Sequence, residues 1–120
     1  MPEEINEIQG HYWDLIKETC FNNFNGKKII HSMRKYPKYI HSFIFINESP
    51  GFILRDIEKN IYHADMIYIM FETKDKDKIF NMIADWSADE IHLLTKDEKE
   101  SFLHSDNDKS KMSIIRLWWD

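Results

Sequence analysis

The chain has 120 residues, 42% of them hydrophobic, and a formal net charge of −5, which predicts one globular domain (1–120) with an acidic surface. A single cysteine excludes an internal disulfide framework and suits a reducing compartment. No apolar run is long enough to span a membrane, and the first residues lack the pattern of a signal peptide. Only three glycines are present, so no glycine-rich phosphate loop is available. We therefore expect a cytoplasmic protein without membrane association or cofactor.

The N-terminal segment, residues 3–24, is predicted to form an amphipathic helix. Apolar side chains recur at three- and four-residue steps from Ile5 to Leu15, and acidic residues occupy the first turns. The Asn-Gly pair at 25–26 is typical of a left-handed helix stop. Cys20 would then lie on this helix and pack in the core, as free cysteines usually do.

Residues 27–36 fit either a helix or a strand. The helix is preferred, because Pro37 would end it at Tyr36. Residues 39–47 predict a strand, since their centre is aromatic and β-branched.

Residues 51–57 are also ambiguous. The turn signal at 47–51 and the apolar run Phe52–Leu54 favour the second strand of a hairpin, while a helix from Pro50 is the alternative. With the hairpin, the chain would continue into a strand at 64–73 and form a three-stranded antiparallel meander at about residues 39–73.

The strand at 64–73 is predicted to be central in the sheet. Its residues from Met66 to Phe71 are all apolar or aromatic, so Met66, Tyr68 and Met70 would face one side and Ile67, Ile69 and Phe71 the other. Such a strand needs cover on both faces. The best candidates are the helix at 3–24 and a helix at 75–86, which Asp75 or Asp77 would cap.

Three elements complete the predicted fold. Residues 90–94 fit a short strand, and Thr95 with Glu98 matches a capping box that begins a short helix. Residues 112–119 predict a final strand. The fold class is therefore α+β, with an N-terminal helix and a mainly antiparallel sheet covered by helices 3–24 and 75–86.

The sequence contains few patterns for catalysis. None of the six histidines forms a two-histidine zinc motif, and Cys20 has no close Cys or His partner. His63 near Asp65, and His92 near Asp89 and Glu90, could each form an acid–base pair in a small enzyme or part of a metal site. Half-exposed structural histidines are the preferred interpretation, so we assign no catalytic residue and no metal ligand.

Charge is unevenly distributed along the sequence. Residues 27–39 are basic with interleaved tyrosines, as in nucleic-acid-binding patches, but the acidic total argues against direct nucleic-acid binding. Residues 85–108 contain eight acids and two lysines. A solvated face is the simplest meaning of such a stretch.

Tryptophans near the acids favour a second meaning. Neighbouring residues of a strand face opposite ways, so only one of Trp118 and Trp119 can point into a given core layer. An exposed tryptophan among carboxylates suits recognition of a basic partner. The predicted partner-binding residues are Asp85, Trp86, Asp89, Glu90, Asp97, Glu98, Glu100, Asp106, Asp108 and Trp118.

These features lead to a functional hypothesis. The chain is expected to be a non-catalytic binding protein of the bacterial immunity or antitoxin type, which inhibits a basic toxin such as a nuclease. Three alternatives remain: a small enzyme that uses His63 or His92, a phage-type inhibitor whose acids mimic nucleic acid, and a general scaffold or regulatory subunit.

Overall fold

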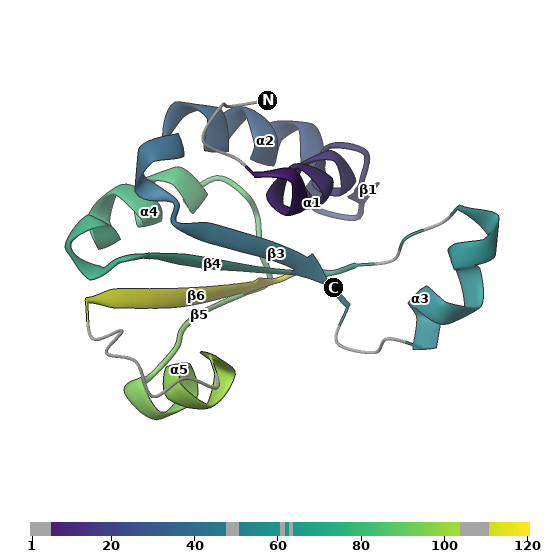
Figure 1. Cartoon of the computed structure of the whole chain (residues 1–120). Helices are drawn as coiled ribbons and strands as arrows, with labels where there is room; N and C mark the ends of the chain where they lie inside the picture. Colours follow the sequence, from purple (N-terminus) through teal and green to yellow (C-terminus); the bar gives the residue numbers. More distant parts are fainter. Residues whose placement is uncertain (1–5, 48–50, 61, 63, 104–110) are drawn as a thin grey trace.

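The computed structural model describes residues 6–47, 51–60, 62, 64–103 and 111–120, and it confirms the predicted α+β class (Figure 1). Its main sheet is antiparallel, with strand order β3–β4–β6–β5. The strands are β3 (Ser42–Ile46), β4 (Met66–Glu72), β5 (Glu90–Leu93) and β6 (Met112–Trp118). A separate small hairpin pairs β1 (Cys20–Phe21) with β2 (Phe24–Asn25).

Helices are distributed unequally over the two faces of this sheet. Figure 1 shows α1, α2 and α4 above the sheet, α5 below it, and α3 beyond its end. Their bounds are α1 (Glu7–Lys17), α2 (Gly26–Lys35), α3 (Gly51–Asp56), α4 (Lys76–Ile83) and α5 (Lys96–Leu103). Short 3₁₀ turns are η1 (Pro37–Tyr39), η2 (Ile57–Lys59) and η3 (Thr73–Asp75).

The central position of β4 is confirmed, but its cover differs from the prediction. Ile67, Ile69 and Phe71 are each 0% exposed beneath the upper helices, whereas Tyr68 and Met70 on the other side are only half-buried. The two helices expected to cover opposite faces, α1 and α4, both lie above the sheet. Large aromatic side chains account for this, because Trp13, Phe24, Trp86 and Trp119 all fill the upper core.

The N-terminal helix is shorter than predicted. It ends at Lys17, and the chain then turns through the β1–β2 hairpin, with Asn22 at a φ of 43°. Asn25 and Gly26 begin a helix instead of ending one, because the Asn25 side chain accepts a hydrogen bond from the backbone of Lys28 at 3.2 Å. Cys20 therefore lies on the hairpin and is exposed, so the prediction that it packs in the core was wrong.

The two ambiguous segments are both helical. The preferred helix at 27–36 is confirmed as α2, but the preferred strand at Phe52–Leu54 was wrong, because this segment belongs to α3. The meander thus lacks its middle strand, and β3 pairs directly with β4 from Ser42 opposite Met70 to Ile46 opposite Met66. An apolar run of three residues is too short for its periodicity to distinguish helix from strand.

The remaining predicted elements are confirmed with small shifts at their ends. The helix expected at 75–86 is α4, and Asp75 is at its N-cap position without a side-chain capping bond. The short strand at 90–94 is β5, and the last strand is β6. The capping box is present, since Thr95 N donates to Glu98 Oε1 at 2.9 Å and Glu98 N donates to Thr95 Oγ1 at 3.2 Å.

Candidate functional site: a half-open face of the sheet

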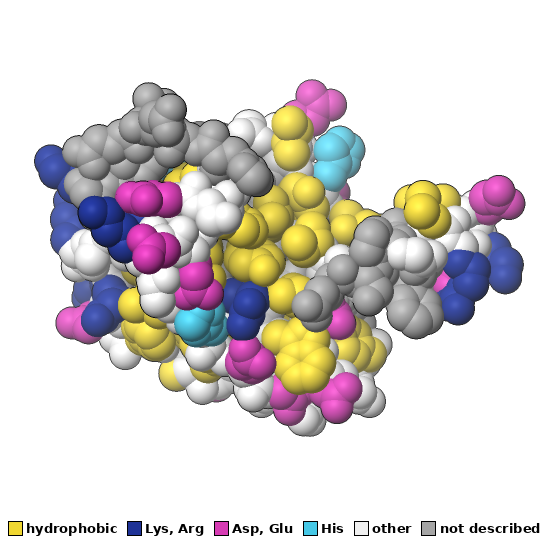
Figure 2. Space-filling model, turned by 90° about the horizontal axis from the view of Figure 1, so that it is seen from below, with side chains coloured by type: hydrophobic (Ala, Val, Ile, Leu, Met, Phe, Trp, Pro, Cys, Tyr) yellow, Lys and Arg dark blue, Asp and Glu magenta, His cyan; other side chains and the backbone are white. Residues whose placement is uncertain are grey.

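The sheet face opposite α1, α2 and α4, called the lower face below, is only partly covered by α5. Strand register and the alternation of side chains assign its residues. They are Ser42, Ile44, Ile46, Met66, Tyr68, Met70, Glu72, Glu90, His92, Met112, Ile114, Arg116 and Trp118. Figure 2 shows hydrophobic side chains gathered in the middle of this face, with acidic side chains around them. An apolar sheet surface rimmed by charge is typical of an interaction site.

Trp118 lies at one end of this face. It is half-buried, its strand neighbours are Met66 and Glu90, and its indole Nε1 donates to Asp65 Oδ2 at 3.3 Å. Trp119 points to the opposite face, where it is 1% exposed. The expectation that only one of the two faces the upper core is therefore confirmed.

Carboxylates surround Trp118 because β5 begins beside it. Asp89 N donates to Trp118 O at 2.9 Å, and the Asp89 carboxylate accepts from Asp120 N at 2.8 Å. Glu90 forms an ion pair with Arg116 at 2.6 Å. Burial lowers the pKa of Arg116, but hydrogen bonds with Glu90 and Tyr68 outweigh it and leave that pKa raised. Arg116 therefore stays charged and partly neutralises Glu90.

A second pair joins β5 to α5. Nε2 of His92 lies 2.9 and 3.1 Å from the two carboxylate oxygens of Glu98. The backbone N–H of Thr95, followed by His92, lowers the pKa of Glu98 to about 2. Glu98 thus caps α5 and ties it to the sheet, so its carboxylate is already engaged by this chain.

The lower-face contact of α5 is small. The ring of Phe102 stacks on Tyr68 with centroids 4.7 Å apart, and Lys99 Nζ donates to Met112 O at 2.8 Å. None of the α5 side chains is fully buried. Between this helix and the sheet is a hollow of about 70 Å³, lined by apolar side chains that include Ile44 and Leu103. Ile114 and Met66 are buried on the lower face, whereas Ile44, Tyr68 and Met70 are only half-buried, so its cover is incomplete.

The predicted partner-binding residues divide into separate groups. Asp89, Glu90, Glu98 and Trp118 meet on or beside the lower face, and Asp97 and Glu100 are exposed on α5. Asp85 lies on the helix side, 3.9 Å from Lys28 of α2. The remaining acids, Asp106 and Asp108, are outside the described residues.

Trp86 does not have the position that its acidic neighbours suggested. It is 1% exposed, and its backbone oxygen accepts from Trp119 Nε1 at 3.1 Å. It belongs to the buried hydrophobic core, so its indole cannot serve as a surface anchor. Its own Nε1 has no acceptor among the described protein atoms.

Sequence reasoning missed several residues of the site. Asp65 was considered only as a neighbour of His63, and Arg116 was given no role, although Arg116 is the only charged residue in the apolar run from Ile114 to Trp119. That interruption was a usable signal, because a charge within a strand requires a partner on its own face. The His92–Glu98 contact had no sequence signal, since it depends on how α5 folds back under the sheet. His63 lies outside the described residues.

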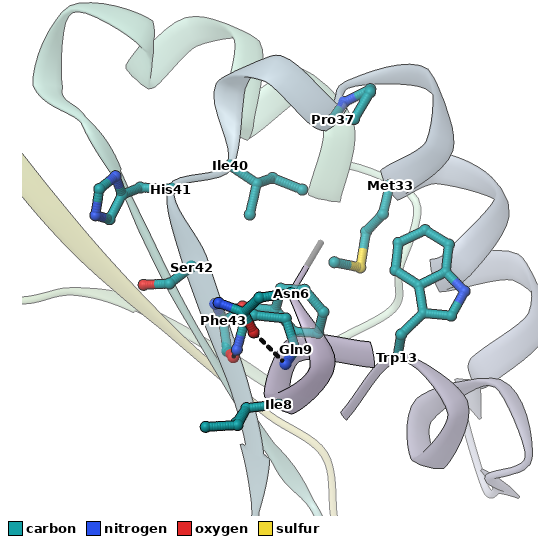
Figure 3. A pocket seen from close by; sticks show the side chains of 10 residues that line it. All are labelled: Asn6, Ile8, Gln9, Trp13, Met33, Pro37, Ile40, His41, Ser42 and Phe43. Carbon is teal, nitrogen blue, oxygen red and sulfur yellow. Dashed lines mark hydrogen bonds between the residues drawn. The ribbon is translucent and has the colours of Figure 1, made fainter. Parts of the chain in front are cut away.

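A second concave feature lies on the other side of the edge strand β3. Figure 3 shows a cavity between α1, η1 and β3, with a volume of about 200 Å³. Its walls are mainly apolar, with Trp13, Met33 and Phe43 at its base. The Gln9 amide in the wall is engaged, because Nε2 donates to Phe43 O and Oε1 accepts from Phe43 N, both at 2.7 Å. This cavity can accept a small apolar group.

The described part of the chain contains no cluster of three or more His, Cys, Asp or Glu side chains placed to hold a metal ion. No helix within the same residues is long and apolar enough to cross a membrane.

No protein-family model matches this chain, and neither the curated proteins nor the solved structures yield a significant match.

Proposed function

We propose that the protein is a non-catalytic inhibitor of the immunity or antitoxin type, which neutralises a basic toxin domain such as a nuclease in the cytoplasm. The observation that carries the proposal is the position of Trp118. Its half-buried indole lies at the end of the partly covered lower face, with Asp65, Asp89 and Glu90 beside it. Aromatic anchors within a charged rim are common hot spots of protein interfaces.

The apolar part of the lower face supports a protein partner. Ile44, Ile46, Tyr68 and Met70 are neither fully buried nor scattered, because they occupy adjacent positions on the paired strands β3 and β4. A partner that covered them would remove contiguous apolar surface from water, which favours association by about 25 cal/mol per Å². Small polar substrates would gain nothing comparable there.

The charges near this face support a basic partner. Arg116 and His92 already engage Glu90 and Glu98, whereas Asp97 and Glu100 on α5 form no ion pair with any described residue. Exposed, uncompensated carboxylates attract a cationic protein over a Debye length of about 8 Å at physiological salt. We therefore assign steering to Asp97 and Glu100, and short-range contact to Trp118 and its neighbours.

Association kinetics test this assignment. The partner for the experiment is the purified product of the adjacent gene, measured by stopped-flow fluorescence over a series of salt concentrations. Combined Asp97→Lys and Glu100→Lys should lower the association rate constant about tenfold at low salt and flatten its salt dependence.

A matched control separates local steering from net charge. Asp14→Lys with Glu18→Lys makes the same charge change at exposed positions on or next to α1, on the other side of the sheet. These substitutions should alter the rate constant by less than about threefold. Equal effects of the two double variants would show that the lower side of the molecule does not steer the partner.

A further inference from the structure

The two edge strands of the sheet differ in how their outer backbone groups are satisfied. At β3, the Gln9 amide bonds both Phe43 N and Phe43 O at 2.7 Å, and the Tyr62 hydroxyl donates to Phe45 O at 2.7 Å. Side chains of this chain thus occupy positions that a neighbouring strand would fill. Protection of this kind prevents unwanted strand pairing.

The other edge, β5, has outward-pointing backbone groups at Ile91 and Leu93. Leu94 N donates to Ile114 O at 2.9 Å, so the register of β5 with β6 directs the backbone of Glu90, His92 and Leu94 toward β6. Backbone direction alternates along an antiparallel strand, and Ile91 and Leu93 therefore point away from it. No strand among the described residues pairs with this edge, and its sequence contains no proline or lysine.

The side chains of β5 are apolar on one face of the sheet and polar on the other. Ile91 and Leu93 are on the helix side of the sheet and remain 46% and 36% exposed. Glu90 and His92 are on the lower face, where Glu98 lies beside His92. A strand added at this edge would therefore meet apolar groups on one face and carboxylates on the other.

We infer that an extended segment of the basic partner adds to β5 as an antiparallel fifth strand, with alternating apolar and basic side chains. This inference rests on the function proposed above. The apolar side chains would cover Ile91 and Leu93. The basic ones would lie beside Glu90 and Glu98, whose side chains remain 52% and 44% exposed although Arg116 and His92 already engage them. Strand addition derives affinity from main-chain hydrogen bonds and specificity from the alternating side chains.

Charge makes the partner's segment a better occupant than a second copy of this chain. Antiparallel self-pairing through Ile91 and Leu93 would place His92 opposite the His92 of the second copy. It would also bring the Glu98 carboxylates of both copies to the same face of the joined sheet.

A fluorescent peptide of about six residues that alternates valine and lysine is the probe. In the inferred register the valines face Ile91 and Leu93, and their N–H groups bond β5. N-methylation of the valine amides should weaken binding about tenfold or more, because it removes these bonds. N-methylation of the lysine amides, which point outward, should change the dissociation constant by less than about twofold.

Two variants of the protein complement the peptides. Ile91→Pro removes an outward N–H without removing a bond to β6, so it should abolish binding while circular dichroism stays unchanged. Ile8→Ala removes an exposed apolar side chain from α1 and should leave binding as it was. If Ile91→Pro fails to fold, the N-methylated peptides still test whether binding depends on main-chain hydrogen bonds to β5.

Several outcomes would overturn the inference. These are no binding at about 1 mM peptide, binding that is insensitive to valine N-methylation, or a dimer of the protein alone that Ile91→Pro dissociates. None of them refutes the proposed inhibitor, which could dock through the lower face without strand addition. Failure to neutralise the adjacent gene's product, in contrast, would refute the proposed function whatever the peptides do.

Discussion

The side-chain amide of Gln9 binds both backbone groups of Phe43, donating to the oxygen and accepting from the nitrogen at 2.7 Å each. A residue of the first helix thereby takes the place of a strand beside β3. This contact fixes α1 over the sheet and closes one edge, which leaves β5 as the open one.

Gln9→Glu should destabilise the fold by about 2 kcal/mol, because the carboxylate cannot donate to Phe43 O and repels it. Chemical denaturation at neutral pH measures this loss. Acidification that protonates the introduced carboxyl restores a donor, so the difference from the unsubstituted protein should shrink. A loss that does not depend on pH would contradict this role of the Gln9 amide.

Gly26→Ala should cost at least about 3 kcal/mol. A Cβ at Gly26 would lie 1.7 Å from the backbone oxygen of Ile16, at the point where α2 meets the end of α1. Gly51→Ala is the control, since nothing lies within 4 Å of its added Cβ. It should be neutral or stabilising by up to about 1 kcal/mol. Thermal or denaturant unfolding of both variants gives the comparison, and equal stabilities would contradict the tight helix contact.

Much of the fold could be predicted from local sequence, and the errors have physical causes. The uninterrupted apolar run from Met66 to Phe71 identified the central strand, and the Thr95–Glu98 spacing identified a helix start. The hairpin after Lys17 was missed because apolar residues continue at helical spacing through it. Which face each helix covers depends on long-range packing that no local pattern encodes.

The site was harder to predict than the fold. Acids clustered in sequence are separated in space, since Asp85 lies near Lys28 on the helix side and Glu90 near Trp118 on the lower face. The expectation that Trp86 is exposed was wrong, because an acidic neighbour in sequence does not determine whether a side chain is buried. Trp118 was identified by a rule of strand geometry, which held because β6 is regular to its end.

Trp86→Phe and Trp119→Phe should differ in stability by about 2 kcal/mol. Both indoles are 1% exposed and lose the same atoms, but only Trp119 Nε1 donates a hydrogen bond, to Trp86 O. Trp86→Phe removes a buried N–H that has no acceptor among the described residues, which offsets part of the lost packing. Denaturant unfolding tests the order. Equal losses of stability would mean that Trp86 Nε1 donates a hydrogen bond in solution.

Acid should weaken the attachment of α5 through Glu98. Its pKa in the fold is about 2, below its ordinary value of 4.5, so its contribution to stability is fully present above pH about 4.5 and is lost as the pH falls toward 2. Glu98→Gln can still cap Thr95 but does not titrate. The variant should therefore lack this part of the pH dependence, which a series of thermal melts between these pH values measures. If the stability of both proteins changed identically as the pH fell, Glu98 would not be the source of this pH dependence.

Trp118 provides the most direct test of the proposed function. The measurement is the growth of cells that express the adjacent gene's product together with this protein or its variants. The wild type and Ile8→Ala should protect the cells, whereas Trp118→Ala, folded as judged by circular dichroism and present at the same level, should lose most of the protection. Full protection by Trp118→Ala, or an adjacent product that the wild type does not neutralise, would contradict a toxin inhibitor acting through this face.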